Sequence, residues 1–67
     1  MINVKVNGEP RTLDQPVTVL ALLQHLDIDP RVVAVEHNRV VVKRARYGET
    51  VVNDGAEVEI VAFVGGG

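Results

Sequence analysis

The chain has 67 residues, no cysteine and a formal net charge of −2 at pH 7. This length allows one small domain, and the missing cysteine excludes disulfides, thiolate metal sites and thiol catalysis. The negative charge argues against general nucleic-acid binding, and no apolar run approaches the roughly 20 residues that span a membrane. The first residues alternate and lack the apolar centre of a signal peptide, so we expect a soluble, cytoplasmic protein without a membrane partner.

The first residues predict a β-hairpin. Ile2, Val4 and Val6 alternate with polar residues, which is the period of a half-buried strand. Asn7-Gly8 follows, and both residue types tolerate the positive φ of a tight hairpin turn. A second short strand is expected over residues 11–13.

A helix is predicted next. Thr18 can cap its N-terminus with the side-chain hydroxyl. Residues at helical spacing then form one apolar face: Val19, Leu22, Leu23 and Leu26. The stretch from Asp27 to Pro30 ends the helix, because proline restricts the residue before it to extended geometry.

The second half of the chain predicts three more strands. They cover residues 32–36, 40–42 and 57–64, with turns at 37–39 and 53–55, while residues 43–52 show no clear pattern. The order is strand, strand, helix and three strands, and one helix can cover only one face of a sheet. We therefore predict an α+β fold of the β-grasp (ubiquitin-like) type, with a mixed four- to five-stranded sheet curled around one helix.

Few side chains suggest chemistry within this domain. His25 and His37 lack further ligands at a recognisable spacing, and no phosphate-binding glycine pattern occurs. We therefore expect neither a metal site nor an enzyme active site. One basic cluster consists of Arg39, Lys43, Arg44 and Arg46, and the last turn and strand carry Asp54, Glu57 and Glu59. These charges either keep a small domain soluble or steer partners.

The C-terminal sequence is the most unusual feature. It reads Phe63-Val64-Gly65-Gly66-Gly67, and we expect a folded domain over residues 1–64 followed by a flexible tail over 65–67. Glycines give a narrow tail that can approach another backbone closely. The α-carboxylate of Gly67 is ionised and unreactive until a partner activates it with ATP. The alternative is a frayed terminus without function.

Three stretches of sequence together resemble one family. VNGEPRTLDQPVTVLALLQHL (residues 6–26), VAVEHNRVVVKRARYGETVV (33–52) and NDGAEVEIVAFVGGG (53–67) are similar to the ThiS family of thiamine-pathway sulfur carriers. The resemblance spans nearly the whole chain, and the ending EIVAFVGGG is its most specific part. It implies the β-grasp fold that the order of elements also predicts.

The resemblance implies a carrier and not an enzyme. An E1-like adenylating enzyme (ThiF-like) would adenylate Gly67 with ATP, so the carrier itself would bind no cofactor. A sulfur donor protein would supply the sulfur of a glycyl thiocarboxylate, and a thiazole synthase (ThiG-like) would consume it. Gly65 and Gly66 would thread the tail into these partners.

The end of the last strand is the predicted docking site for the partners. Phe63 is out of phase with Val58, Ile60 and Ala62, so we expect it to face outward, with Phe63 and Val64 as anchors. The alternative is that Phe63 closes the core at the edge of the sheet.

Three other functions fit the same pattern. The small subunit of molybdopterin synthase shares the fold, the tail and the activation chemistry. A ubiquitin-like modifier would end in an isopeptide bond to a target lysine. A plain β-grasp interaction module would have an inert tail, because a fold alone does not fix a function.

Overall fold

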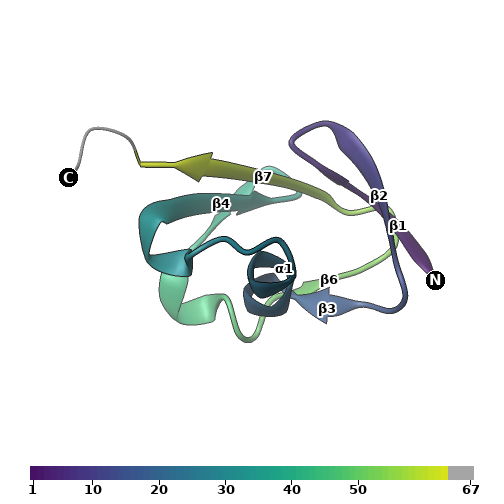
Figure 1. Ribbon diagram of the computed structural model, residues 1–67, viewed down its shortest axis with the longest axis horizontal. Coiled ribbons are helices and arrows are strands. Elements are labelled where there is room, and N and C mark those ends of the chain that lie inside the picture. Colours follow the sequence, from purple (N-terminus) through teal and green to yellow (C-terminus); the bar gives the residue numbers. More distant parts are fainter. Residues whose placement is uncertain (64–67) are drawn as a thin grey trace.

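The computed structural model describes residues 1–63 and contains short strands around one helix (Figure 1). Valine-rich alternating segments account for the strands, since β-branched side chains pack well on a pleated surface. The elements in chain order are β1 (Ile2–Val6), β2 (Glu9–Leu13), β3 (Val17–Thr18), α1 (Val19–His25), β4 (Val33–His37), β5 (Val40–Val42), β6 (Val51–Val52) and β7 (Glu57–Ala62). Two short 3-10 turns, Pro30–Val32 and Arg44–Arg46, complete the chain that is described.

The main sheet has five strands in the order β2-β1-β7-β4-β5. β7 is the central strand and is parallel to its neighbour β1, while the other neighbouring strands are antiparallel. The short strands β3 and β6 form a separate antiparallel pair. Figure 1 shows α1 on one side of the main sheet, with β3 and β6 on that same side. This arrangement confirms the predicted β-grasp fold and leaves the other side of the sheet without a covering layer.

The predicted turns and strand limits need small corrections. The Asn7-Gly8 turn is confirmed, with φ of 52° and 80°, but β2 begins at Glu9 and not at residue 11. The second hairpin turn contains only Asn38 and Arg39, both with positive φ, so His37 still belongs to β4. β4 begins at Val33 because Pro30 starts a 3-10 turn before it.

The larger omission concerns the strands β3 and β6. Each has two residues, which is too short for a periodic pattern, so the sequence did not indicate them. β6 also lies in the stretch 43–52 that remained unassigned. β7 ends at Ala62, whereas the prediction extended it to Val64, a residue outside those described.

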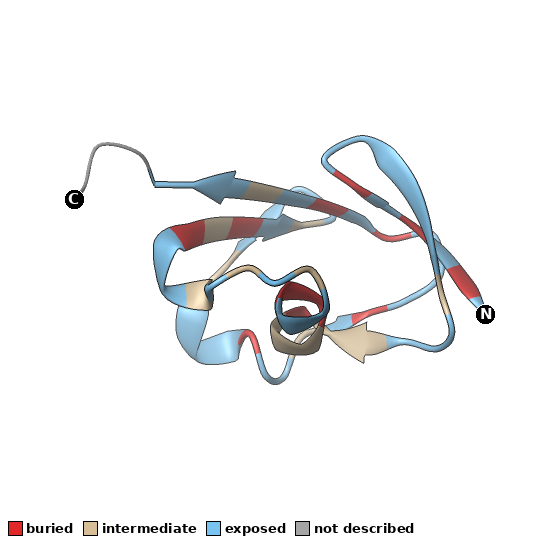
Figure 2. Cartoon of the chain, in the orientation of Figure 1, coloured by how far each residue is buried: buried red, intermediate tan, exposed pale blue. Residues whose placement is uncertain are grey.

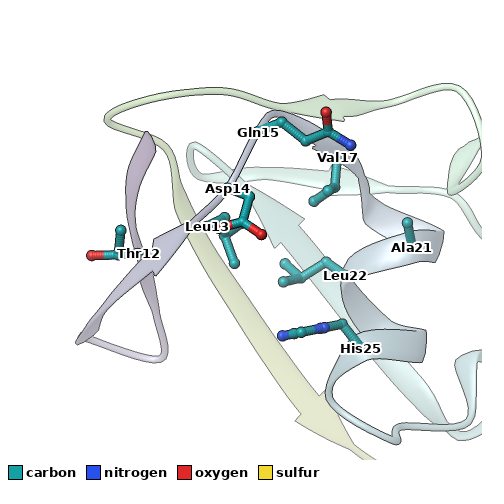
Figure 3. Close-up of a pocket in the computed structure, with 8 residues that line it drawn as sticks. All are labelled: Thr12, Leu13, Asp14, Gln15, Val17, Ala21, Leu22 and His25. Carbon is teal, nitrogen blue, oxygen red and sulfur yellow. The ribbon is translucent and has the colours of Figure 1, made fainter. Parts of the chain in front are cut away.

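The helix follows its sequence signals closely. Ala21 N–H donates to Thr18 Oγ1 at 3.1 Å, which is the predicted N-cap. Leu22 and Leu23 are almost fully buried, and Figure 3 shows Leu22 projecting from α1 toward Leu13 at the end of β2. After α1 the chain reverses through Asp27 in the left-handed region, with φ of 58°.

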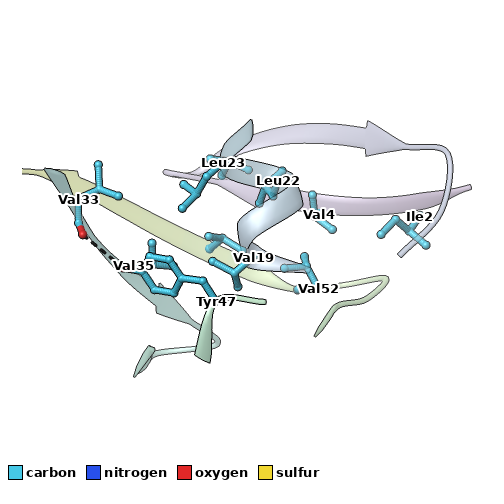
Figure 4. Close-up of a cluster of buried hydrophobic side chains, with 12 residues drawn as sticks. Ile2, Val4, Val19, Leu22, Leu23, Val33, Val35, Tyr47 and Val52 are labelled. Atoms are coloured by element: carbon cyan, nitrogen blue, oxygen red, sulfur yellow. Dashed lines mark hydrogen bonds between the residues drawn. The ribbon is translucent and has the colours of Figure 1, made fainter. Parts of the chain in front are cut away.

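The core is aliphatic, with one aromatic residue at its rim. All twelve buried side chains among the described residues are hydrophobic: Ile2, Val4, Val6, Val19, Leu22, Leu23, Val33, Val35, Tyr47, Val52, Ala56 and Val58 (Figures 2 and 4). Tyr47 is 3% exposed and donates its hydroxyl to the Val33 carbonyl at 3.3 Å.

This tyrosine has a specific structural task. In β4 the residues 33, 35 and 37 direct their backbone groups toward β5, but β5 pairs only with residues 35–37. The carbonyl of Val33 therefore finds no strand beside it, and the Tyr47 hydroxyl supplies its hydrogen bond. The ring of Tyr47 belongs to the buried core, and its hydroxyl has this additional role.

Candidate functional site

The last strand leaves the core along its own length. Val58 is 1% exposed, Ile60 is half-buried and Ala62 is exposed, although all three lie on the face toward α1. Figure 2 shows this change from buried to exposed along β7. β7 therefore ends at the margin of the folded body.

The backbone remains fixed up to the last described residue. Val33 and Ala62 are the last paired residues of β4 and β7, and Phe63 N–H then donates to the Val32 carbonyl at 2.8 Å. Phe63 is thus positioned by main-chain contacts, independently of its side chain.

The side chain of Phe63 faces solvent, as expected. It is 61% exposed, and so is Val61, the residue two positions earlier on the same face. Val32, which carries the carbonyl partner of Phe63, is also exposed. The alternative in which Phe63 closes the core is therefore wrong. Its role as a docking anchor, together with Val64, stays a prediction, and Val64 lies outside the described residues.

The outer face is the side of the main sheet that α1 does not cover. Next to the apolar end at Val61 and Phe63 it carries exposed carboxylates on two neighbouring strands. Glu36 on β4 and Glu59 on β7 lie directly opposite each other. Glu57 lies two residues before Glu59 on the same strand. Like charges in this position destabilise a sheet slightly. None of the three forms an ion pair with another residue in the stretch 1–63, so the outer face combines an apolar end with a negative one.

Asp54 does not belong to this negative region. Its carboxylate accepts a hydrogen bond from the Asn3 N–H at 2.7 Å and so closes the turn before β7. The predicted acidic group of Asp54, Glu57 and Glu59 therefore divides into one structural residue and two exposed ones.

The basic residues lie around β5, the edge strand next to β4. Arg39 is in the turn before β5, and Lys43 and Arg44 follow that strand. Arg46 pairs with Glu49 at 2.9 Å, and both side chains are exposed, so this ion pair adds little stability.

One carboxylate has a shifted pKa. Side-chain and backbone hydrogen bonds from Arg31 lower the pKa of Asp29 to about 2. The side-chain hydrogen bond to Asp29 and the charge of that carboxylate raise the pKa of Arg31. Asp29 caps the 3-10 turn that leads into β4, so this pair shapes the backbone beside the exit of β7, and both side chains are exposed.

The histidines do not form a catalytic or metal site with the other described residues. No group of three potential ligands occurs within residues 1–63. A shallow hollow of about 380 Å³ between the end of β2 and α1 contains His25 and Asp14 on its walls (Figure 3). These two side chains form no hydrogen bond or ion pair with each other. His37 lies at the end of β4, away from this hollow.

The predicted sulfur attachment site, Gly67, and the threading residues Gly65 and Gly66 lie outside the described residues. The structure gives the position of Phe63, the last described residue before them. Among its helices, none is long and apolar enough to cross a membrane.

Comparison with known proteins points to one family. The family model of the ThiS family matches residues 4–67. A thiazole synthase of Paramagnetospirillum magneticum is 50% identical over 62 residues, which are 92% of this chain and 19% of that protein. A second thiazole synthase, of Magnetococcus marinus, is 39% identical over 98% of this chain. The chain spans about a fifth of the length of these two relatives.

Two shorter relatives agree with this result. The sulfur carrier protein ThiS of Bacillus subtilis is 38% identical over 50 residues, which are 75% of this chain and 76% of that protein. The crystal structure of a thiamine biosynthesis protein (ThiS) of Geobacter metallireducens superimposes with a TM-score of 0.87 at 39% identity, covering 98% of this chain and all of that one. The chain therefore belongs to the ThiS family.

Proposed function

We propose that this chain carries sulfur for thiamine biosynthesis, as a thiocarboxylate on Gly67. The observation that carries the proposal is the contrast between a closed aliphatic core and an exposed exit. No buried polar side chain and no metal-binding group occurs in residues 1–63, while β7 leads out of the core to an exposed Phe63. Family membership supports a sulfur carrier, and so does the name of the Bacillus subtilis relative.

The proposed chemistry begins with an unreactive carboxylate. A carboxylate oxygen of Gly67 attacks the α-phosphorus of ATP, pyrophosphate leaves, and an acyl adenylate forms. Hydrosulfide released by a donor protein then attacks the acyl carbon, a C–S bond forms, the C–O bond to AMP breaks, and the S–H proton passes to solvent. The product is a thiocarboxylate, whose sulfur is a better nucleophile than the oxygen it replaces.

The partners supply all sites for these steps. The sequence contains no phosphate-binding loop, so an E1-like adenylating enzyme binds the ATP and the carrier acts as its substrate. A thiazole synthase then takes the sulfur into its product. The match of this chain to about a fifth of two proteins named thiazole synthase supports that partner over molybdopterin synthase. Because the activation consumes ATP, we propose that the carrier acts in the cytoplasm.

The fold suits a carrier because it holds the tail at one end of a rigid strand. β7 lies between β1 and β4 in the middle of the sheet, so the exit at Phe63 has a fixed direction. Four extended residues span at most about 13–14 Å, which is enough for residues 64–67 to enter a narrow active site. Glycines keep that path free of side chains.

Docking on the outer face would complete the recognition. Phe63 and Val61 offer an exposed apolar contact next to the tail, and large aromatic residues often dominate interface energies. Glu36, Glu57 and Glu59 would favour a partner with a basic surface beside its apolar pocket.

The test uses the purified chain with its adenylating enzyme, ATP and a sulfur donor. Intact mass is expected to show one oxygen exchanged for one sulfur, and ATP–pyrophosphate exchange is expected to depend on the carrier. A variant that lacks Gly67 should fold normally and support neither reaction. The proposal would be refuted if the mass stayed unchanged although the adenylating enzyme activates its own natural carrier. It would also be refuted if the variant without Gly67 supported full ATP–pyrophosphate exchange. Transfer of the sulfur to molybdopterin synthase but not to thiazole synthase would reassign the pathway.

A further inference from the structure

The edge strand β5 exposes two valines beside open backbone groups. Val40 and Val41 are 66% and 68% exposed, which is more than any other described valine. β5 is the last strand of the main sheet, so only one of its sides pairs with a neighbour, β4. An exposed apolar edge of this kind is a template for an additional strand.

The register shows which backbone groups point outward. Asn38 N–H donates to the Glu57 carbonyl at 2.8 Å, so the even-numbered residues of β4 direct their backbone groups to β7 and the odd-numbered ones to β5. β5 therefore pairs with β4 through Val40 and Val42. The N–H and C=O of Val41, between them, are directed away from the sheet.

The opposite edge of the sheet is protected. β2 is the other outer strand, and Pro10 stands opposite Lys5 at one of its outward-facing positions. Proline has no N–H to offer an incoming strand and is a usual device on edges. β5 contains no proline, so the two edges differ in whether another strand can be added.

Cations flank β5 at both ends. Arg39 precedes it and Lys43 follows it, each two residues from Val41, and neither forms an ion pair with a carboxylate in the part of the chain described. A shallow hollow of about 360 Å³ beside the strand adds Arg46, which is paired with Glu49, and Thr50. One carboxylate without an ion pair in the part of the chain described, Glu36, lies opposite Val41 on β4.

We propose that β5 binds an extended acidic peptide segment by strand addition, with Val41 at the centre. The expected peptide has five consecutive residues in the order acidic, any, apolar, any, acidic. The apolar residue lies beside Val41, and the two acidic residues lie beside Arg39 and Lys43.

A second copy of this chain is a poorer occupant. Antiparallel pairing of two β5 strands about Val41 would place Arg39 of each copy opposite Lys43 of the other. Like charges directly opposite each other destabilise a strand pair, so the flanking cations both disfavour self-association and select an acidic segment. This binding site contains no residue of β7, and the proposal does not depend on the sulfur-carrying role.

The test is an NMR titration of the isotope-labelled full chain with the peptide acetyl-Ser-Glu-Thr-Val-Thr-Glu-Ser-amide. We expect the amide signals of Val41 and Lys43 to shift most and hydrogen exchange at Val41 to slow. N-methylation of the peptide valine should abolish these shifts, because it removes a hydrogen bond to the strand. A peptide with lysines in place of the glutamates should not bind.

Variants separate charge from backbone pairing. Lys43→Glu should weaken binding about threefold or more, while Arg11→Glu on β2 makes the same charge change away from the site and should leave binding unchanged. Val41→Pro should abolish binding, and the N-methylated peptide gives the same information should that variant fail to fold. Shifts confined to other residues, equal affinity of Lys43→Glu and the wild type, or concentration-dependent dimerisation through Val41 without peptide would each overturn the proposal.

Discussion

The two ends of β7 differ in how deeply they are buried. Near its start, Val58 is 1% exposed between β1 and β4, and just beyond its end Phe63 is 61% exposed. Both positions have the same kind of main-chain support, since Phe63 N–H still bonds to the Val32 carbonyl. One strand therefore serves two purposes: its first half completes the core, and its second half carries an exposed apolar surface at Val61.

The sharpest test of this contrast is one substitution made at both ends. Val58→Thr places a hydroxyl in the core without a partner, and we expect it to lower the free energy of unfolding by about 2 kcal/mol. Val61→Thr keeps the side-chain shape and the strand propensity at an exposed position. We expect it to change the free energy of unfolding by less than about 0.5 kcal/mol. Urea unfolding of the two variants measures both values, and similar losses would show that the end of β7 is part of the core.

The second prediction concerns binding at the exposed end. Phe63→Ser should weaken the complex with the adenylating enzyme about tenfold or more, while the free energy of unfolding stays within about 0.5 kcal/mol of the wild type. The matched control is Val51→Ser, which also replaces an exposed apolar residue with serine but lies on β6. This variant should bind the adenylating enzyme normally. Calorimetric titration gives the affinities. Unchanged binding by Phe63→Ser, or a large loss of stability, would remove Phe63 from the interface.

The third prediction tests how the core side of the sheet is closed. Tyr47→Phe leaves the buried Val33 carbonyl without its hydrogen bond, and we expect a loss of about 1 kcal/mol in the free energy of unfolding. Sulfur loading should be unaffected, because Tyr47 lies on the covered side of the sheet. A neutral result in urea unfolding would mean that water or another group replaces the hydroxyl.

The smallest effect is expected at the exposed pair beside the exit of β7. Because the folded-state pKa of Asp29 is lowered to about 2, its contribution to stability is present above the ordinary pKa near 3.8 and is lost as the pH falls toward 2. An NMR titration of the Asp29 carboxyl should give a midpoint near 2, and Arg31→Gln should raise it toward the ordinary value. A midpoint that does not respond to Arg31→Gln would assign the shift to another cause.

The sequence predicted those parts of the fold that have a period or a specific turn residue. Alternation identified β1, Asn7-Gly8 identified the first turn, and Thr18 with the leucine spacing identified α1. The two-residue strands β3 and β6 have no period, so only their pairing in three dimensions defines them. The hydroxyl of Tyr47 was equally hidden, because its task arises from the different lengths of β4 and β5.

The candidate site was predictable in part for a similar reason. The phase of Phe63 relative to Val58 and Ile60 indicated its outward direction, and the structure agrees. The opposition of Glu36 and Glu59 could not be inferred, because residues 23 positions apart become neighbours only through the register of β4 and β7. The open edge at Val41 likewise depends on the order of strands in the sheet.

The measurement that tests the central proposal most directly is the position of the sulfur after loading. Fragmentation of the loaded chain by tandem mass spectrometry should place the exchanged atom on the Gly67 fragment alone, with all fragments from residues 1–66 unchanged. Sulfur located on any other residue, or a natural protein that continues as a peptide chain beyond Gly67, would contradict the account.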